Sequence, residues 1–278
     1  MLNENRDKIC FWKVSYHCVY EKLSGNIMKC LLTDSAKSDS AKSDVDLALF
    51  IILPNQMFYV LTLPPRQILS FSSRYLVKAG DHNLKRRERS EQDIYPERFF
   101  VHEDYVDRKF INDIALIKLR EKVKLSPFAR TLCLPEKDEG DLAIPMKYGF
   151  VTGWGVTQAL RHGEDPEPQN RYSTRLQYSA FTIQGGQLCA NRSAIAFNST
   201  VTFCAGDGKG GNDTCQGDSG GAFVREGKRG EDYRWVATGL VSWGLGCAQR
   251  NQYGYYTRVY PFTDWIKNTI KENTEAGD

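Results

Sequence analysis

The sequence predicts an all-β protein. From Tyr75 onward, short runs rich in Val, Ile, Leu, Phe and Tyr alternate with turn clusters, as in Ile114–Leu119, Arg175–Ile183 and Trp235–Trp243. Regular turn signals of this kind are typical of a sandwich or of barrels. The one convincing helical pattern is terminal: Pro261 opens an apolar stripe at helical spacing, formed by Phe262, Trp265, Ile266 and Ile270.

Size, charge and cysteine content narrow the class of protein. The chain has 278 residues, enough for one two-lobed domain or two small ones. A net charge of +3 is too small to favour nucleic acid or an acidic membrane as partner. Eight cysteines without a C-x-x-C pair favour an oxidising compartment, and hence a secreted protein. Met1–Cys18, however, is charged and does not read as a signal peptide.

Residues 1–65 differ in character from residues 66–278, which we interpret as the packed domain. Asp34–Asp44 repeats D-S-A-K-S and is too polar to bury a core, so we predict a disordered linker there. Leu47–Leu63 is apolar but is interrupted at Pro54, so no confident membrane segment is predicted. A transmembrane or signal-anchor segment stays a minor alternative.

A glycine-rich turn is the main candidate for chemistry. Asn212–Phe223 reads N-D-T-C-Q-G-D-S-G-G-A-F. Its glycines allow a sharp turn that would present the Ser219 hydroxyl outward. The same turn would aim the amides of Gly217 and Ser219 at one point, where an oxyanion could form. The alternative is a surface turn without chemistry.

A serine nucleophile needs a base, which is usually an imidazole oriented by a carboxylate. The best candidate for the carboxylate is Asp113, in F-I-N-D-I-A-L-I-K-L, because it leads directly into an apolar strand. A buried carboxylate without a partner is costly, so its position calls for a function. The alternative is an aspartate that merely begins a strand.

Several motifs in order resemble the trypsin-like (chymotrypsin-fold, S1-type) serine proteases. They are G-D-S-G-G, N-D-I-A-L-I-K-L, V-T-G-W-G at Val151–Gly155, V-S-W-G at Val241–Gly244 and Y-T-R-V at Tyr256–Val259. The resemblance runs from Tyr75 to Ile270 and does not include the N-terminal quarter. It implies two six-stranded antiparallel β-barrels with a C-terminal α-helix, the first barrel being incomplete.

The resemblance assigns catalytic roles residue by residue. Ser219 matches the nucleophile, and the amides of Gly217 and Ser219 match the oxyanion hole. Asp113 matches the carboxylate that orients the histidine. Asp218 matches the carboxylate of the activation ion pair, which in the family binds a new N-terminus after cleavage.

The resemblance also assigns a substrate pocket. Asp213 matches the pocket floor, where a carboxylate selects Arg or Lys before the scissile bond. Gly244 and Gly254 match the glycines that keep the pocket open. Ser242, Trp243 and Gly244 match the segment that pairs with the substrate backbone.

The resemblance implies two disulfides, Cys189–Cys204 and Cys215–Cys247. Cys133, in R-T-L-C-L-P, matches a cysteine that tethers a propeptide or a non-catalytic chain. The sequence leaves the pairing of Cys10, Cys18, Cys30 and Cys133 open.

The catalytic histidine is missing from its expected place. The template separates its histidine and aspartate by about 45 residues, and no histidine lies at that distance before Asp113. His82, His102 and His162 lie in ordinary positions. His17, in W-K-V-S-Y-H-C, resembles the family's segment but would need an insertion of roughly 35 residues. We keep His17 as the candidate base, while favouring a coincidental match of a short motif.

The expected function is a secreted serine endopeptidase that cleaves proteins or peptides after Arg or Lys through an acyl-enzyme on Ser219. Because the histidine segment and an activation site are missing, we predict little or no activity for this chain. The alternatives are a pseudoprotease that binds without cleaving, and a truncated product that does not fold.

No cofactor is expected. Asp81, Glu88 and Glu91 fall where calcium-binding relatives place ligands, so calcium is a minor alternative. Lys85, Arg86 and Arg87 in the same loop argue against it electrostatically and favour an exposed basic loop that recognises anions.

Overall fold

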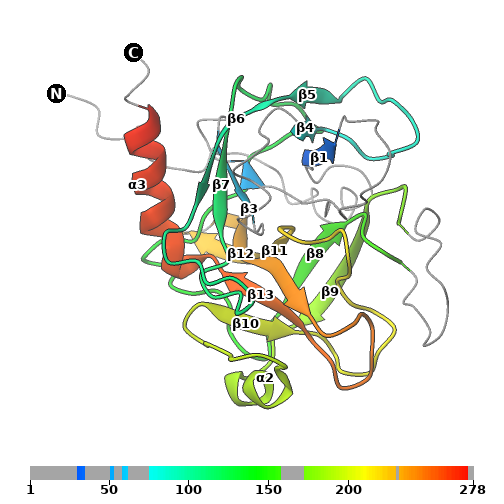
Figure 1. Ribbon diagram of the computed structural model, residues 1–278, viewed down its shortest axis with the longest axis vertical. Coiled ribbons are helices and arrows are strands. Elements are labelled where there is room, and N and C mark those ends of the chain that lie inside the picture. Colours follow the sequence, from blue (N-terminus) through cyan, green and yellow to red (C-terminus); the bar gives the residue numbers. More distant parts are fainter. Residues whose placement is uncertain are drawn as a thin grey trace.

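The computed structural model describes residues 30–34, 51–52, 58–61, 75–157, 172–229 and 232–274 (Figure 1). The predicted linker Asp34–Asp44 lies outside these ranges except for Asp34, as does most of Leu47–Leu63. Strands dominate the described residues, which confirms the all-β prediction.

The second lobe is a six-stranded antiparallel sheet that closes into a barrel. Its strand order is β10-β13-β12-β11-β8-β9. The strands are β8 (Tyr148–Gly153), β9 (Gln177–Thr182), β10 (Thr202–Ala205), β11 (Ala222–Arg229), β12 (Asp232–Gly244) and β13 (Gly254–Arg258). A bridge between Ile183 and Ala205 joins the two edges, and the Gly206 amide donates to the Thr182 carbonyl at 3.0 Å.

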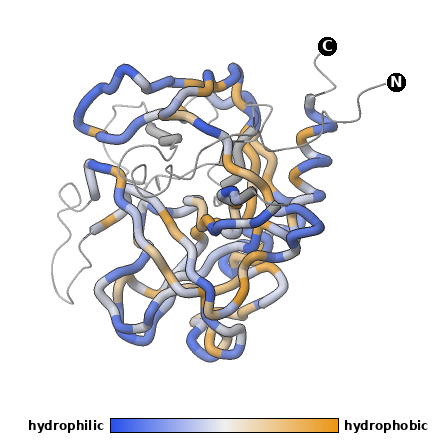
Figure 2. The backbone as a smooth tube through the Cα atoms, turned by 180° about the vertical axis from the view of Figure 1, so that it is seen from behind, coloured by the Kyte–Doolittle hydropathy of each residue, from blue (hydrophilic) through white to orange (hydrophobic). Residues whose placement is uncertain are grey.

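Aromatic side chains fill this barrel. Phe203, Phe223 and Tyr256 are almost fully buried, and their ring centroids lie 5.0 to 5.2 Å apart. They come from three different strands, whose alternating residues point into the barrel. Figure 2 shows hydrophobic colours concentrated along the strands and hydrophilic colours along the surrounding loops.

The first lobe consists of two smaller sheets. One has the order β1-β4-β5, and the other has the order β2-β3-β7-β6. The strands are β1 (Cys30–Asp34), β2 (Ile51–Ile52), β3 (Phe58–Leu61), β4 (Tyr75–Ala79), β5 (Gln92–Ile94), β6 (Pro96–Val101) and β7 (Ala115–Leu119). Val77, Ile94, Ile117 and Leu119 are among its buried core residues. The boundary near residue 65 stays a prediction.

The predicted C-terminal helix is confirmed as α3 (Thr263–Thr274), which follows the short 3-10 helix η4 (Tyr260–Phe262). Phe262 and Ile266 are buried in a cluster that also contains Ile114 and Leu116 from the first lobe. The helix therefore covers the junction of the lobes. The seven-residue helix α2 (Gly186–Arg192) was not predicted, because it buries only Cys189 and has no side-chain cap.

Two arginines from the barrel hold the segment that connects the lobes. Arg234 lies 3.2 Å from Glu136 and 2.5 Å from Glu139, and Arg258 lies 2.5 Å from Asp141. The side chains of Arg234 and Glu139 are 11% and 4% exposed, so this pair is largely withdrawn from solvent. Removing one member of such a pair would leave the other charge buried without a partner, which would strongly destabilise the fold.

Substitution of Gly149 by alanine should destabilise the barrel. A Cβ at Gly149 would lie 2.1 Å from Phe223 Cε1 and 2.8 Å from Arg225 Cγ, so the core would have to shift. We expect a loss of about 1–3 kcal/mol in the free energy of unfolding, measured by urea denaturation. Gly185→Ala is the control, because its Cβ would meet nothing within 4 Å. Equal effects of the two substitutions would contradict this account.

Candidate active site

The Ser219 turn depends on two glycines with left-handed backbone angles. Gly217 has φ +89° and Gly220 has φ +74°, values that residues other than glycine rarely adopt. The Asp218 amide donates to the Cys215 carbonyl at 3.0 Å, and the Gly221 amide donates to the Asp218 carbonyl at 2.9 Å. Ser219, which is half-buried, therefore lies within the second of two consecutive tight turns.

Asp218 points from this turn toward the V-T-G-W-G motif. Its Oδ1 accepts the Gly155 amide at 2.9 Å, and its Oδ2 accepts the Cys215 amide at 3.1 Å. A Cβ at Gly153 would lie 1.8 Å from Asp218 Oδ1, so a glycine is required there. The contact brings together two motifs that lie far apart in the sequence.

Asp113 is buried beneath the site, with 4% of its surface exposed. Its Oδ2 accepts a hydrogen bond from the Ser242 hydroxyl at 2.5 Å, and its backbone carbonyl accepts one from Thr257 Oγ1 at 2.9 Å. Burial raises the pKa of Asp113 to about 6, although the Ser242 bond acts in the opposite direction. The role of the Ser242 hydroxyl in holding Asp113 was not predicted, because only its place beside the substrate was inferred.

One short stretch of β12 connects Ser219 to Asp113. The Gly220 amide donates to the Val241 carbonyl at 2.8 Å, and the Val241 amide donates to the Gly221 carbonyl at 2.8 Å. The next residue is Ser242, which binds Asp113. The structure thus brings these two predicted catalytic residues to the same stretch of strand.

Asp213 lies half-buried behind the Ser219 turn. Its Oδ2 accepts the Ala248 amide at 3.1 Å, and its Oδ1 accepts the Thr214 amide at 2.8 Å. Burial raises the pKa of Asp213 to about 6 despite these two bonds, and the negative charge of Asp218 adds to the increase. The Cys215–Cys247 disulfide holds the two backbone segments beside it.

The end of β12 at Gly244 and the start of β13 at Gly254 lie next to the segment that carries Asp213. Gly244 pairs with Gly254, whose Cβ would lie 2.9 Å from Thr214 Oγ1. At Gly244 a Cβ would meet no atom closer than 3.6 Å, so that glycine borders open space. Trp243 stacks on Tyr255, with ring centroids 3.7 Å apart. The predicted pocket residues therefore lie together.

The two described histidines lie elsewhere. The His82 amide donates to Glu88 Oε2 at 2.7 Å, and the His102 ring packs against Phe262 and Trp265. Within the described ranges, neither histidine hydrogen-bonds Asp113 or Ser219. His17 and His162 lie outside those ranges.

The structure has both disulfides that the resemblance implied, Cys189–Cys204 and Cys215–Cys247. Cys133 is also disulfide-bonded. Cys10 and Cys18 lie outside the described residues, and of Cys30 only the backbone is described.

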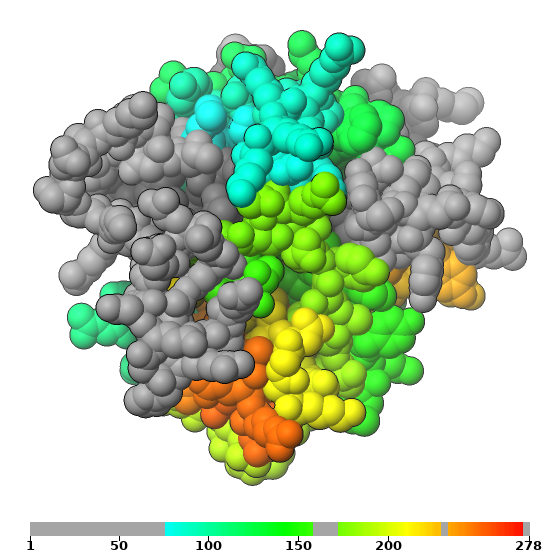
Figure 3. Space-filling model, turned by 90° about the vertical axis from the view of Figure 1, so that its right-hand side faces the viewer, coloured from blue at the N-terminus to red at the C-terminus, as the bar shows by residue number. Residues whose placement is uncertain are grey.

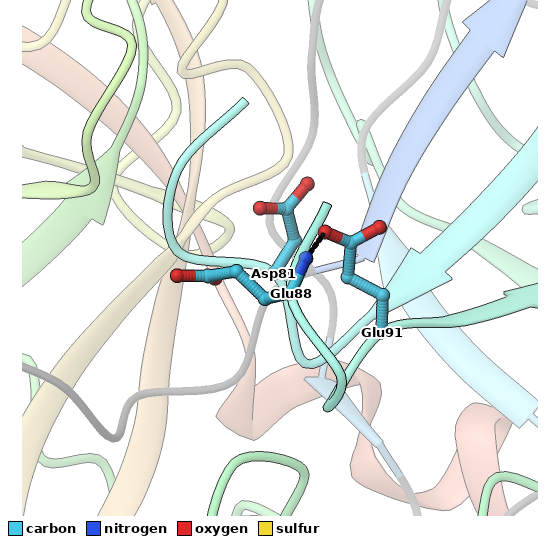
Figure 4. A group of neighbouring side chains, drawn as sticks. All are labelled: Asp81, Glu88 and Glu91. Carbon is cyan, nitrogen blue, oxygen red and sulfur yellow. Dashed lines mark hydrogen bonds between the residues drawn. The ribbon is translucent and has the colours of Figure 1, made fainter. Parts of the chain in front are cut away.

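The carboxylates of Asp81, Glu88 and Glu91 form a cluster in which the ligand atoms lie within 4.8 Å of one another (Figure 4). Several of their oxygens have protein partners: Glu88 Oε2 accepts the His82 amide, and Glu91 Oε1 accepts the Glu88 amide at 2.5 Å. The Lys78 ammonium lies 2.8 Å from Glu91 Oε2 and supplies positive charge there. Calcium at this cluster stays a prediction.

Comparison with known proteins identifies the family. A sequence model described as Trypsin matches residues 67–266. The chain belongs to the trypsin family of serine proteases. It is 34% identical to trypsin-3 of Salmo salar and 36% identical to trypsin of Xenopus laevis, each over 203 residues. It is 35% identical to serine protease 1 of Homo sapiens over 207 residues. These matches cover 73% of this chain and 74–76% of the relatives.

Membership of the trypsin family makes the chain a serine endopeptidase by family, with proteins as the class of substrate. Enzymes of this family need no cofactor. Among the helices that the structure describes, none has both the length and the apolar character needed to span a membrane.

Replacing Asp113 by asparagine should stabilise the fold at neutral pH. The folded pKa of about 6 lies above the ordinary value of 3.8, so the folded state binds the proton more tightly. Stability from this group is therefore present at low pH and is lost as pH rises through 6. We expect Asp113→Asn to gain on the order of 1–3 kcal/mol at pH about 7.5, and little at pH about 4, in urea denaturation.

The exposed residue Asp104 offers the matched control. Asp104→Asn should change the free energy of unfolding little at either pH. If Asp113→Asn destabilises the protein equally at both pH values, the interpretation of Asp113 as an uncompensated buried carboxylate is wrong.

Proposed function

We propose that this chain binds protein substrates with trypsin-like specificity, holding an Arg or Lys side chain against Asp213. The observation that carries the proposal is the environment of Asp213. Its carboxylate is half-buried, and within the described residues it accepts hydrogen bonds from two backbone amides. Among the described residues, no cationic side chain lies within ion-pair distance of it, so a guanidinium or ammonium of the substrate would supply the missing counter-charge.

Ser219 is the proposed nucleophile. Its oxygen attacks the carbonyl carbon of the Arg or Lys residue, the peptide C–N bond to the next residue breaks, and the amine leaves with the proton that the hydroxyl has lost. Water then adds to the acyl-enzyme and releases the acid. The amides of Gly217 and Ser219 would donate hydrogen bonds to the carbonyl oxygen as it becomes negative.

Turnover is proposed to be strongly reduced. The serine hydroxyl must lose a proton as it attacks, and neither described histidine is placed to accept it. Removing one member of a Ser-His-Asp triad typically lowers the rate by several orders of magnitude and leaves only the contribution of binding and the oxyanion hole. His17 stays the candidate base. Asp218 is proposed to form the activation ion pair if a new N-terminus becomes available.

The alternative is a pseudoprotease that binds substrates without cleaving them. The observation that favours it is that neither described histidine, His82 or His102, hydrogen-bonds Asp113 or Ser219. Both functions use the same pocket at Asp213, so they differ only in the reaction at Ser219.

We propose an extracellular location, because disulfides persist in oxidising compartments. The peptidase domain is proposed to span residues 66–278, in line with the family match at residues 67–266. Cys133 is proposed to tether an N-terminal propeptide segment. Its amide donates to the Trp235 carbonyl at 3.3 Å, so Cys133 itself lies beside β12.

Binding of p-aminobenzamidine should depend on ionised Asp213. Because the pKa of this carboxyl is about 6, protons compete with the amidinium below that pH. We expect the affinity for p-aminobenzamidine to fall about tenfold as the pH is lowered from about 7.5 to about 5. Fluorescence titration at each pH measures this affinity. Asp213→Asn should weaken binding by about 100-fold or more at neutral pH.

The control for this titration is Asp207→Asn, which removes an exposed carboxylate near the pocket and should change the affinity little. Unaltered binding by Asp213→Asn would contradict the assignment of the pocket.

A fluorophosphonate probe should label Ser219 far more slowly than it labels human serine protease 1, by about three orders of magnitude or more. Labelling is followed by mass spectrometry of the intact chain, with Ser219→Ala as the blank. A rate comparable to that of the human enzyme would show that a competent base is present, and would refute reduced turnover.

A further inference from the structure

The loop between β4 and β5 carries its positive charge on its outer side. Lys85, Arg86, Arg87 and Arg89 are all exposed. Arg175, also exposed, joins them because Asn83 and Arg175 form a β-bridge and the Leu84 amide donates to the Thr174 carbonyl at 2.9 Å. We call these five side chains the basic face; they are Lys85, Arg86, Arg87, Arg89 and Arg175.

Glu88 and Glu91, in the same loop, have partners within the loop or in β4. Glu88 accepts the His82 amide, and Glu91 accepts the Glu88 amide and lies 2.8 Å from the Lys78 ammonium (Figure 4). Asp93 lies 2.7 Å from the same ammonium. Asp81 is only 5% exposed. Among the described residues, none of the carboxylates therefore forms an ion pair with the basic face.

The basic face is connected to the candidate active site by residues 172–175. A Cβ at Gly217 would lie 2.8 Å from the Tyr172 ring, and the Ser173 amide donates to the Trp154 carbonyl at 3.1 Å. Two residues further, Arg175 reaches the loop. Figure 3 shows the cyan loop in direct contact with the yellow-green segment below it, and that segment in contact with the neighbouring green and yellow surface.

We propose that the basic face binds an acidic segment of a protein substrate, at a distance from the bond cleaved at Ser219. Four of its five side chains are arginines, whose planar forks bind carboxylates through paired hydrogen bonds. Uncompensated charge of one sign also attracts an oppositely charged partner over long range. The identity of the partner as a substrate, though not the anion site itself, rests on the proposed peptidase function.

A peptide fits this face better than a membrane or a polysaccharide does. The residues with large exposed apolar side chains do not include any of the loop, so nothing there would insert into lipid. The positive charge ends beside residues 172–175, which lead to Gly217. An extended peptide, rising about 3.3 Å per residue, can follow that path from one site to the other.

The test is a binding measurement on the full chain carrying Ser219→Ala. The probe is a short fluorescein-labelled peptide of Asp, Glu and Gly, without Lys or Arg. Its binding is measured by fluorescence polarisation. We expect saturable binding that weakens as salt rises from about 0.05 M to about 0.5 M. Replacing Lys85, Arg86, Arg87 and Arg89 by glutamine should weaken it by about tenfold or more.

The matched control replaces four exposed basic residues remote from the loop by glutamine; they are Lys147, Arg192, Lys228 and Lys271. It should bind the peptide like the parent chain. Urea denaturation of both variants checks that the fold is retained. Equal loss in both variants, or no loss in the loop variant, would overturn the proposal.

A sulfated oligosaccharide of similar charge is the second probe. Binding of this oligosaccharide without binding of the peptide would overturn the assignment to an acidic protein segment, as would the absence of binding by either. The probe peptide contains no Lys or Arg to bind at Asp213, and the Ser219→Ala variant lacks the proposed nucleophile. A failure of the peptidase proposal therefore leaves this measurement unaffected, and the two failures are distinguishable.

Discussion

The pairing of Val241 with the Ser219 turn holds the candidate site together. Two backbone hydrogen bonds attach Gly220 and Gly221 to Val241, and the neighbouring Ser242 hydroxyl binds Asp113. Asp113 comes from the first lobe and Ser219 from the second, so this short stretch of β12 sets how the two approach each other. The closed barrel behind it is filled by closely packed aromatic rings, which support that stretch.

Two carboxylates at the site are held in an environment that opposes their charge. Burial raises the pKa of both Asp113 and Asp213 to about 6. A structure selected for stability alone would replace or pair such groups, because each lowers the stability of the fold when ionised. An opposite charge beside either carboxylate would offset this cost, as the proposed substrate cation would at Asp213.

The loop between β4 and β5 separates charge in a different way. Lys78 in β4 approaches Glu91 and Asp93, whereas the basic residues of the loop turn outward. The Lys78 ammonium lies beside the acidic cluster, and the outer charge of the loop faces solvent. The connection between the lobes differs from the outer side of this loop, because Arg234 forms ion pairs there with Glu136 and Glu139. There the charges are paired and structural, while on the outer loop they face solvent.

The fold class, the terminal helix and the turn at Ser219 can be predicted from the sequence, because each depends on local patterns. Strand alternation, the apolar stripe of α3 and the glycines around Ser219 can all be read over a few residues. Helix α2 was not predicted, because it is too short and too weakly capped to leave such a pattern. Only the tertiary structure decided that Ser242 holds Asp113 across 129 residues, and that Arg234 reaches Glu139 across 95. Contacts at that separation depend on how the two lobes pack, and no local pattern of residues encodes that packing.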